Sequence, residues 1–235
     1  MSSKSIPQVV VKDDAFRDPS NTDFRPTHSI PKGGLFSIYR EIEIAAPVQI
    51  VCDVLLDVRK WKDWTAFYGD VTITSHPHSH QRDLTMVQGT NMDFNIQMKP
   101  GSGEEKNKLH VTCSHVGRVR TLEDHDPPAL THIRWTYHNA GHMQPAFVLK
   151  AERENEMEDL GGGRTMYRTW QSFGGLAAKS YRKKYEASLK ERFAEWCADL
   201  KGRVEEVHGA AHGASGTDGD VPEVLIEAAE ITYIT

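Results

Sequence analysis

The sequence predicts an α+β domain in which an antiparallel sheet packs against one long C-terminal helix. Between residues 71 and 173, segments in which apolar and polar residues alternate follow one another without an intervening helical pattern. From 176 to 207, apolar and aromatic residues recur at steps of three and four, the spacing of one helix face. Consecutive strands followed by a final helix favour the α+β class, because a parallel α/β sheet would alternate strands with helices.

The segment 35–44 (LFSIYREIEI) opens the predicted domain as a strand. Its apolar residues share one face at period two, and Arg40 interrupts that face. Ala46 and Pro47 then predict a helix start, because proline fits the first turn of a helix. Apolar residues at helical spacing follow, and RKWKDWTAF (59–67) predicts a second short helix or turn.

The remaining elements follow in order along the chain. The predicted strands cover 71–73, 84–98, 109–115, 133–137, 147–149 and 165–173. The loops between them include HPHSHQRD (76–83), PGSGEEKNK (100–108), DHDPP (124–128) and NEMEDLGGG (155–163). The last of these is predicted to be a polar hairpin tip. The stripe of the final helix consists of Tyr181, Tyr185, Leu189, Phe193, Trp196, Leu200, Val204 and Val207.

A low apolar content indicates that part of the chain lies outside a packed core. Hydrophobic residues make up 38% of the 235 residues. Residues 1–33 are rich in Pro, Ser, Asp, Asn and Thr and predict a flexible or loosely docked arm. The low-complexity segment 208–220 predicts a linker, and the apolar segment 221–235 could dock on the domain or contact a second subunit, so a homodimer stays open. The predicted domain therefore spans 34–207.

Three blocks of the domain resemble a known superfamily. FSIYREIEI followed by AAPVQIVCDVLLDVRKWKDW and GDVTI resembles the opening of the START-like helix-grip superfamily, also called SRPBCC or polyketide cyclase/dehydrase-like. GTNMDFNIQM (89–98) and TWQSFGGL (169–176) resemble its third strand and its last strand with the hinge. The resemblance covers roughly 35–207. It implies a curved sheet that wraps around the C-terminal helix, with a cavity for lipids, sterols, plant hormones, polyketides or quinones.

Four polar residues are candidates for acid–base or hydrogen-bonding roles in such a cavity. They are His115, Arg40, Tyr137 and Gln171. Arg40 could bind a carboxylate or enolate, although a bulge that turns it outward or a structural ion pair is favoured. His115 could serve as a general acid or base, and the alternative is a hydrogen-bonded core histidine. Gln171 is implied by the resemblance, in a strand where family members often place a cavity-facing polar group.

Aromatic and sulfur side chains are candidates for the ligand-binding lining. Cys113 and His115 are predicted to share one strand face, and a nucleophilic Cys–His pair is a weaker alternative. Plain core packing is the alternative to an aromatic lining that shapes a site for a planar ligand. The candidate lining residues are Phe94, Cys113, Trp135, Phe147, Tyr167, Tyr185 and Phe193.

Several classes of protein are not expected. A net charge of −5 argues against a general nucleic-acid binder, and there is no apolar run long enough to span a membrane. The start of the chain lacks the apolar core of a secretory signal, and the three cysteines form no CxxC pair, so a cytoplasmic location is expected. His76, His78 and His80 alternate in a polar loop without acidic or cysteine partners, so no metal site is expected. No phosphate-binding glycine motif or hydrolase elbow occurs, and no cofactor is expected.

The sequence therefore leads to two main hypotheses. One is a cofactor-independent cavity enzyme that promotes cyclisation, dehydration or isomerisation of a hydrophobic polyketide- or terpenoid-like intermediate. The other is a non-catalytic carrier of a lipid, sterol or quinone. A third hypothesis is an interaction module that assembles through 221–235. In the first two, the partner is a hydrophobic small molecule.

Overall fold

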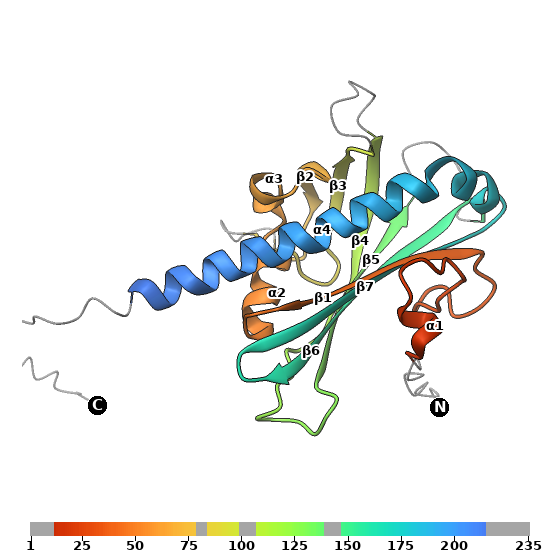
Figure 1. The fold of residues 1–235 in the computed structure, drawn as a ribbon. Coiled ribbons are helices and arrows are strands. Elements are labelled where there is room, and N and C mark those ends of the chain that lie inside the picture. Colours follow the sequence, from red (N-terminus) through yellow and green to blue (C-terminus); the bar gives the residue numbers. More distant parts are fainter. Residues whose placement is uncertain (1–11, 79–83, 99–106, 139–146, 215–235) are drawn as a thin grey trace, which may run out of the picture.

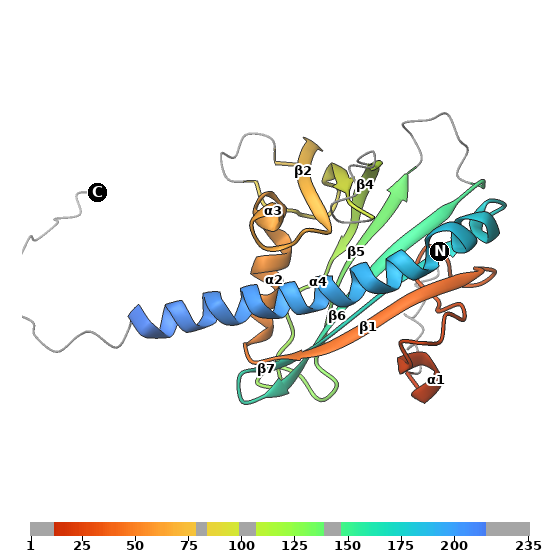
Figure 2. The same cartoon turned by 45° about the horizontal axis from the view of Figure 1, so that its top comes forward.

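A single curved sheet that wraps around a long helix forms the body of the protein. The computed structural model describes residues 12–78, 84–98, 107–138 and 147–214 (Figure 1). Within these residues, seven antiparallel strands form one sheet in the order β1-β7-β6-β5-β4-β3-β2. The long helix α4 lies across one face of this sheet, which we call the inner face (Figure 2). The predicted α+β helix-grip architecture is confirmed.

The elements follow the predicted order. The strands are β1 (Phe36–Ile44), β2 (Tyr68–Ser75), β3 (Asn91–Ile96), β4 (Asn107–Val116), β5 (Leu130–His138), β6 (Lys150–Gly161) and β7 (Arg164–Gly174). The helices are α1 (Asp14–Arg17), α2 (Val48–Leu56), α3 (Trp61–Trp64) and α4 (Ala178–Ala214), with a 3₁₀ turn at Val58–Lys60.

Strand β6 is much longer than predicted. The prediction placed a strand at 147–149 and a polar tip at 155–163, whereas β6 runs from Lys150 to Gly161. The reason is the tight hairpin at its end, where Gly161, Gly162 and Gly163 have φ of 75°, 61° and 69°. A short glycine turn folds β7 directly back along β6, so that Arg153 pairs with Gln171. The charged segment before the turn is therefore the middle of the sheet.

Residues 12–33 of the expected arm lie against the opposite face of the sheet, which we call the outer face. Phe16 of α1 packs edge-on against Tyr39 and Trp170, with ring centroids 5.5 and 5.4 Å apart. The Arg25 guanidinium donates to the backbone carbonyls of Phe16, Asn21 and Asp18 at 2.7–3.0 Å. These residues therefore form a second, smaller core with β1 and β7.

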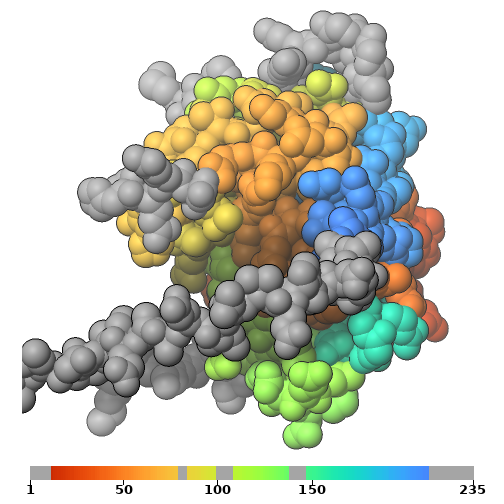
Figure 3. All heavy atoms as spheres, turned by 90° about the vertical axis from the view of Figure 1, so that its left-hand side faces the viewer, coloured from red at the N-terminus to blue at the C-terminus, as the bar shows by residue number. Residues whose placement is uncertain are grey.

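Helix α4 continues beyond its predicted end at residue 207. It extends to Ala214, because residues 208–214 (HGAAHGA) contain three alanines, the strongest helix formers, among the glycines. The second half of α4 lies beside α2, and together they close one end of the inner face (Figure 3). The apolar segment 221–235 lies outside the described residues, so its role stays a prediction.

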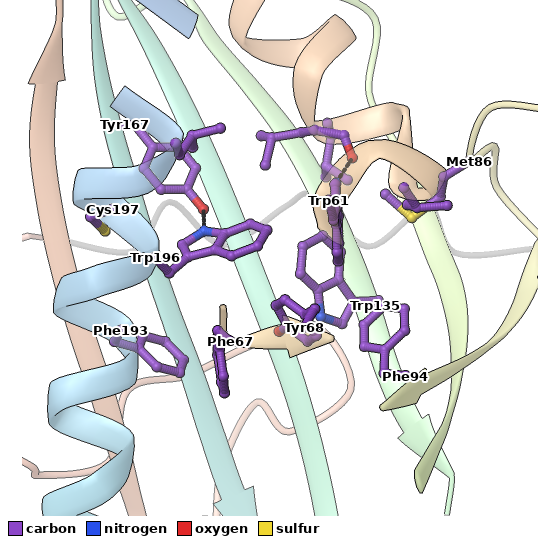
Figure 4. Packing of buried hydrophobic residues seen from close by; sticks show 14 of the residues in the cluster. Trp61, Phe67, Tyr68, Met86, Phe94, Trp135, Tyr167, Phe193, Trp196 and Cys197 are labelled. Atoms are coloured by element: carbon purple, nitrogen blue, oxygen red, sulfur yellow. Dashed lines mark hydrogen bonds between the residues drawn. The ribbon is translucent and has the colours of Figure 1, made fainter. Parts of the chain in front are cut away.

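An aromatic cluster fills the inner face between the sheet, α3 and α4. Trp61 lies near its centre, with ring centroids of Trp196, Tyr68 and Phe94 at 4.9, 5.0 and 5.5 Å (Figure 4). The Trp61 indole nitrogen donates to the Leu55 carbonyl at 3.2 Å, which fixes α3 against α2. The inner face is thus built largely of large rings.

Candidate functional site

One charged side chain lies inside this aromatic interior. Arg153 of β6 is 0% exposed and lies on the inner face, beneath α4. Its Nε donates to Thr169 Oγ1 and its Nη1 donates to the Tyr68 hydroxyl, each at 3.0 Å. Its Nη2 is buried and has no hydrogen-bond partner among the described residues. The guanidinium is therefore fixed on two sides and still has an unused donor group.

Aromatic rings, and no carboxylate among the described residues, surround the Arg153 charge. The guanidinium carbon is 4.2 Å from the Phe193 ring centroid and 4.9 Å from that of Trp196. Burial alone lowers the pKa of Arg153, but the neighbouring phenols of Tyr68 and Tyr167 raise it, and the net shift is upward. Arg153 therefore stays charged, and ring faces stabilise it by cation–π interaction.

A chain of hydrogen bonds joins Arg153 to two phenols. The Trp135 indole nitrogen donates to the Tyr137 hydroxyl at 3.1 Å, and the Tyr137 and Tyr68 hydroxyls hydrogen-bond to each other. Burial raises the pKa of Tyr137 well above its usual value, and the bond to Tyr68 raises it further. We call Tyr137, Tyr68 and Arg153 the inner polar triad.

A second set of polar side chains beside Arg153 is satisfied by hydrogen bonds within the protein. The Tyr167 hydroxyl donates to Asn155 Oδ1 at 2.7 Å and accepts from the Trp196 indole nitrogen at 2.9 Å (Figure 4). Thr169 Oγ1 donates to the Glu154 carbonyl at 2.9 Å. These bonds hold β6, β7 and α4 together and support Arg153 from one side, so this branch has a structural role.

The first turns of α4 leave one end of the inner face partly accessible. The side chains there pack on the core but are only half-buried; they are Leu109, Tyr137, Leu149, Tyr181 and Tyr185. The Tyr181 and Tyr185 rings are in contact, 4.7 Å apart. We call these residues the accessible end of the inner face. It lies opposite the end that α2 closes.

The predicted shared face of Cys113 and His115 is wrong. A β-bulge at this point pairs Cys113 with Trp135 and His115 with Arg134 on β5. The extra residue, Ser114, puts Cys113 on the inner face and His115 on the outer face. Burial raises the pKa of Cys113 to about 12, so it is an inert thiol. Burial, Arg134 and His132 lower the pKa of His115, which lies on the other face of the sheet from the inner polar triad.

Arg40 lies at the edge of the sheet. Its guanidinium donates to the backbone carbonyls of Pro19, Tyr39 and Lys190 at 3.0–3.4 Å. It therefore ties the N-terminal segment and α4 to the edge strand β1. The sequence favoured a bulge or an ion pair for Arg40. In the structure, backbone carbonyls accept from its guanidinium instead.

The other candidates fall into two groups. Phe147 is 60% exposed and precedes β6, so the prediction of an inward strand residue is wrong. Gln171 is 5% exposed and lies on the inner face directly opposite Arg153. The remaining lining candidates, all on the inner face, are Phe94, Trp135, Tyr167, Tyr185 and Phe193. Tyr137 and Gln171 are thus the catalytic candidates that lie beside Arg153.

Two residues of the inner polar triad were not predicted. Tyr68 follows a segment that indicated a short helix or turn, and Arg153 lies in a charged run, KAERENEMED, that resembles a surface loop. The signal that could have revealed Arg153 is the hairpin itself. With a turn at 161–163 and a strand over 165–173, residue 153 has to pair with residue 171.

The histidine-rich loop contains no metal cluster in its described part. His76 Nε2 lies 2.9 Å from the Thr85 carbonyl, and the His78 backbone amide donates to His76 Nδ1. His80 lies outside the described residues. Across the described ranges, no group of three His, Cys, Asp or Glu side chains is arranged to hold a metal ion. In the same residues, no helix combines the length and apolar character needed to cross a membrane.

Comparisons with known proteins establish the fold. No protein-family model and no curated protein matches the sequence. A hypothetical protein, jhp0584 from Helicobacter pylori, matches with a TM-score of 0.53 at 14% identity over 72% of this chain and 87% of that one. The Zhui aromatase/cyclase from Streptomyces sp. R1128 matches with a TM-score of 0.52 at 17% identity, over 74% and 96%. A START superfamily protein from Mycobacterium smegmatis has a TM-score of 0.47 at 14% identity, over 73% and 98%. The first two matches show that this chain shares the helix-grip fold of those proteins, and its activity has to be argued from its own residues.

Proposed function

We propose that the protein binds a hydrophobic polyketide- or terpenoid-like intermediate on its inner face and promotes its cyclisation, dehydration or isomerisation. The observation that supports this proposal is the inner polar triad within an otherwise aromatic interior. The Zhui aromatase/cyclase shares only the fold with this chain, so the proposal depends on these three residues.

Packing alone does not explain a guanidinium at this position. An unpaired charge in an apolar interior costs several kcal/mol or more, and an apolar side chain of similar size would fill the same space. Arg153 remains buried there with an unused Nη2 donor. Departures of this kind from ordinary core composition are expected at functional sites.

The triad can stabilise negative charge that develops on a substrate oxygen. Arg153 donates to the Tyr68 hydroxyl. With Tyr137 as a second donor to the same oxygen, the Tyr68 proton would be available for a ligand oxygen. Fixed donors in a site of low dielectric stabilise an enolate or alkoxide far better than donors in water do. The surrounding rings would hold a flexible substrate in a folded, reactive conformer.

An aldol-type ring closure illustrates the chemistry. The enol carbon forms a bond to a carbonyl carbon, and the carbonyl π bond breaks. The enol oxygen becomes a carbonyl as its proton passes to solvent at the accessible end. Tyr68 gives a proton to the new alkoxide and regains one from solvent through Tyr137, so that no proton is gained or lost overall. The step needs neither an oxidant nor a reductant, and the subsequent loss of water gives the dehydrated ring.

The test is product formation from a synthetic poly-β-keto thioester, followed by liquid chromatography and mass spectrometry. The wild-type protein should accelerate one cyclic product, and Tyr68→Phe should lower that rate by about 100-fold or more, because one fixed donor is lost. Tyr39→Phe is the matched control, because the Tyr39 hydroxyl bonds to Glu41 on the outer face. An unchanged product distribution and rate with the wild-type protein would rule out catalysis on this substrate class.

A carrier remains the second candidate, because most of the side chains on the inner face are apolar or aromatic. Native mass spectrometry of freshly purified protein distinguishes the two functions. A lipid, sterol or quinone that is retained in the protein and released unchanged would favour the carrier. A cyclised product in the same experiment would favour the enzyme.

A further inference from the structure

We infer that the molecule bound on the inner face carries an acidic oxygen, as a carboxylate, enolate or phenolate, which accepts hydrogen bonds from Arg153 Nη2. This inference rests on the proposed function, since it requires a small molecule on the inner face. It defines the ligand as a planar or conjugated body with one anionic oxygen.

The direction of the unused donors is fixed by the bonds that Arg153 already makes. The guanidinium is planar, and its Nε and Nη1 are held by Thr169 and Tyr68 at 3.0 Å. Because the group cannot turn without breaking one of these bonds, Nη2 presents its donors in one direction. A ligand oxygen that reaches this position would complete the hydrogen bonding of a group that the protein leaves incomplete.

The charge balance also calls for an anion. On the strand that carries Arg153, the nearby acidic side chains Glu152, Glu154 and Glu156 point to the outer face and have other partners. Asp159, at the hairpin end of the strand, accepts from the backbone amides of Leu122 and Gly161. The groups that Arg153 contacts are a hydroxyl, a phenol and aromatic rings, all of them neutral. In a low-dielectric interior, a ligand anion would gain a strong charge-assisted hydrogen bond.

The side chains next to Arg153 explain how a ligand would approach and why it would be planar. Ala151, two residues before Arg153 on the same face, pairs with Tyr137 on β5 and Phe173 on β7. This small side chain between two rings lies between the accessible end and the guanidinium. A flat ligand body over Ala151 would contact the Tyr137 ring, and the amide of Gln171 lies opposite Arg153 to receive a second polar group.

The experiment compares matched naphthalene probes by isothermal titration calorimetry at pH 7. The probes are 2-naphthoate, 2-naphthol and the neutral methyl 2-naphthoate. If the natural ligand is a carboxylate, 2-naphthoate should bind about 10- to 100-fold more tightly than its methyl ester, the range of one charge-assisted hydrogen bond. If it is an enolate or phenolate, 2-naphthol should be the tighter binder and should bind with release of its proton.

The outcomes separate this inference from the proposed function. Equal affinity for all three probes would overturn the acidic-oxygen inference and still support apolar ligand binding. Binding of none of them would overturn both.

Variants then assign the preference to Arg153. Arg153→Met should bring the acidic probe to the affinity of the methyl ester, whose own affinity should remain. Arg164→Met, at the exposed hairpin end, should keep the wild-type preference. If Arg153→Met does not fold, Arg153→Lys keeps the charge and should reduce the preference several-fold, since lysine cannot form the planar fork. A preference that persists in the folded Arg153 variants would overturn the assignment.

Discussion

In the described part of the chain, charged side chains lie on both faces of strand β6, but only those on the outer face have partners of opposite charge or donors that satisfy them. On the outer face, Glu152 accepts from the Ser29 amide and hydroxyl at 2.6 and 2.8 Å, and Glu154 accepts from Arg134 at 2.8 Å. Glu156 pairs with Lys12 at 2.8 Å and Arg168 at 3.2 Å. On the inner face, Arg153 has no anionic partner among the described residues.

This difference separates structural charge from functional charge. The outer partners come from the N-terminal segment and the neighbouring strands, so their ion pairs hold distant parts of the chain together. Removing one partner of a buried ion pair strongly destabilises the folded protein, because the other charge loses its partner. Within the described residues, Arg153 does not join distant parts of the chain through an ion pair. Its removal should therefore affect ligand binding more than folding.

The largest expected effect is on the outer face. Arg168 contacts Glu41, Glu156 and Glu158 at 2.6–3.3 Å. Arg168→Met should lower the free energy of unfolding by about 3–5 kcal/mol, because three neighbouring carboxylates lose the cation that they share. Glu156 and Glu41 then keep Lys12 and Arg17, respectively, as cationic partners. Urea denaturation measures this, with Arg164→Met, which breaks an exposed pair, as a control expected to change by no more than about 1 kcal/mol. Equal effects of the two variants would contradict the structural role of the outer charges.

The next effect tests whether the N-terminal segment is part of the fold. Phe16→Ala removes the ring that packs on Tyr39 and Trp170, and the free energy of unfolding should fall by about 3 kcal/mol. The exposed Phe147 provides the matched control, since Phe147→Ala should change it by less than about 0.5 kcal/mol. A Phe16→Ala protein as stable as the control variant would show that this segment adds nothing to stability.

A smaller effect concerns pH on the outer face. Burial raises the pKa of Glu41, but hydrogen bonds from Arg17 and Tyr39 lower it, and the net value lies below the ordinary 4.5. A carboxylate with a lowered pKa stabilises the fold above its unfolded pKa, and this contribution is lost as the pH falls through the folded pKa. Glu41→Gln should therefore reduce the loss of stability between pH 5 and pH 3 by up to about 1 kcal/mol, measured by thermal unfolding. An identical pH profile in the variant would exclude Glu41 as a contributor.

The smallest effect on stability is expected on the inner face. Arg153→Met removes an unpaired buried charge, and this gain offsets the lost bonds to Tyr68 and Thr169. The free energy of unfolding should change by no more than about 1 kcal/mol in either direction. The same urea measurement that reports on Arg168→Met decides this, and a loss of 3 kcal/mol or more would make Arg153 a structural residue.

The order of elements was predictable because it depends on local periodicity. The alternation in β3 and β5 and the stripe of α4 are properties of neighbouring residues, and all three elements are present. Their bounds differ from the prediction, since β3 begins at Asn91 and not at residue 84, and α4 ends at Ala214. The docking of the N-terminal segment could not be predicted from local periodicity. Its docking depends on contacts such as Ser29 with Glu152, which are far apart in sequence.

The candidate site was predictable only in part. Tyr137 and Gln171 were identified because their strands have clear alternation. Arg153 was missed because β6 carries charges on both faces, and charged residues on both faces normally indicate solvent exposure. The position of His115 was misjudged because a one-residue bulge reverses the facing of everything after it, and Ser114 gives no local sign of one.

The tryptophans of this protein are distributed unequally between the two faces of the sheet. Their intrinsic fluorescence can therefore report on ligand binding at the inner face. Four of the five indoles, Trp61, Trp64, Trp135 and Trp196, form one cluster on the inner face, with successive ring centroids 4.9–5.7 Å apart. Trp170 is the single indole on the outer face. Excitation energy passes readily between rings this close, so a ligand beside Arg153 would alter the emission of the whole inner group. In a Trp170→Phe protein, all remaining fluorescence would come from the face that we propose binds the ligand.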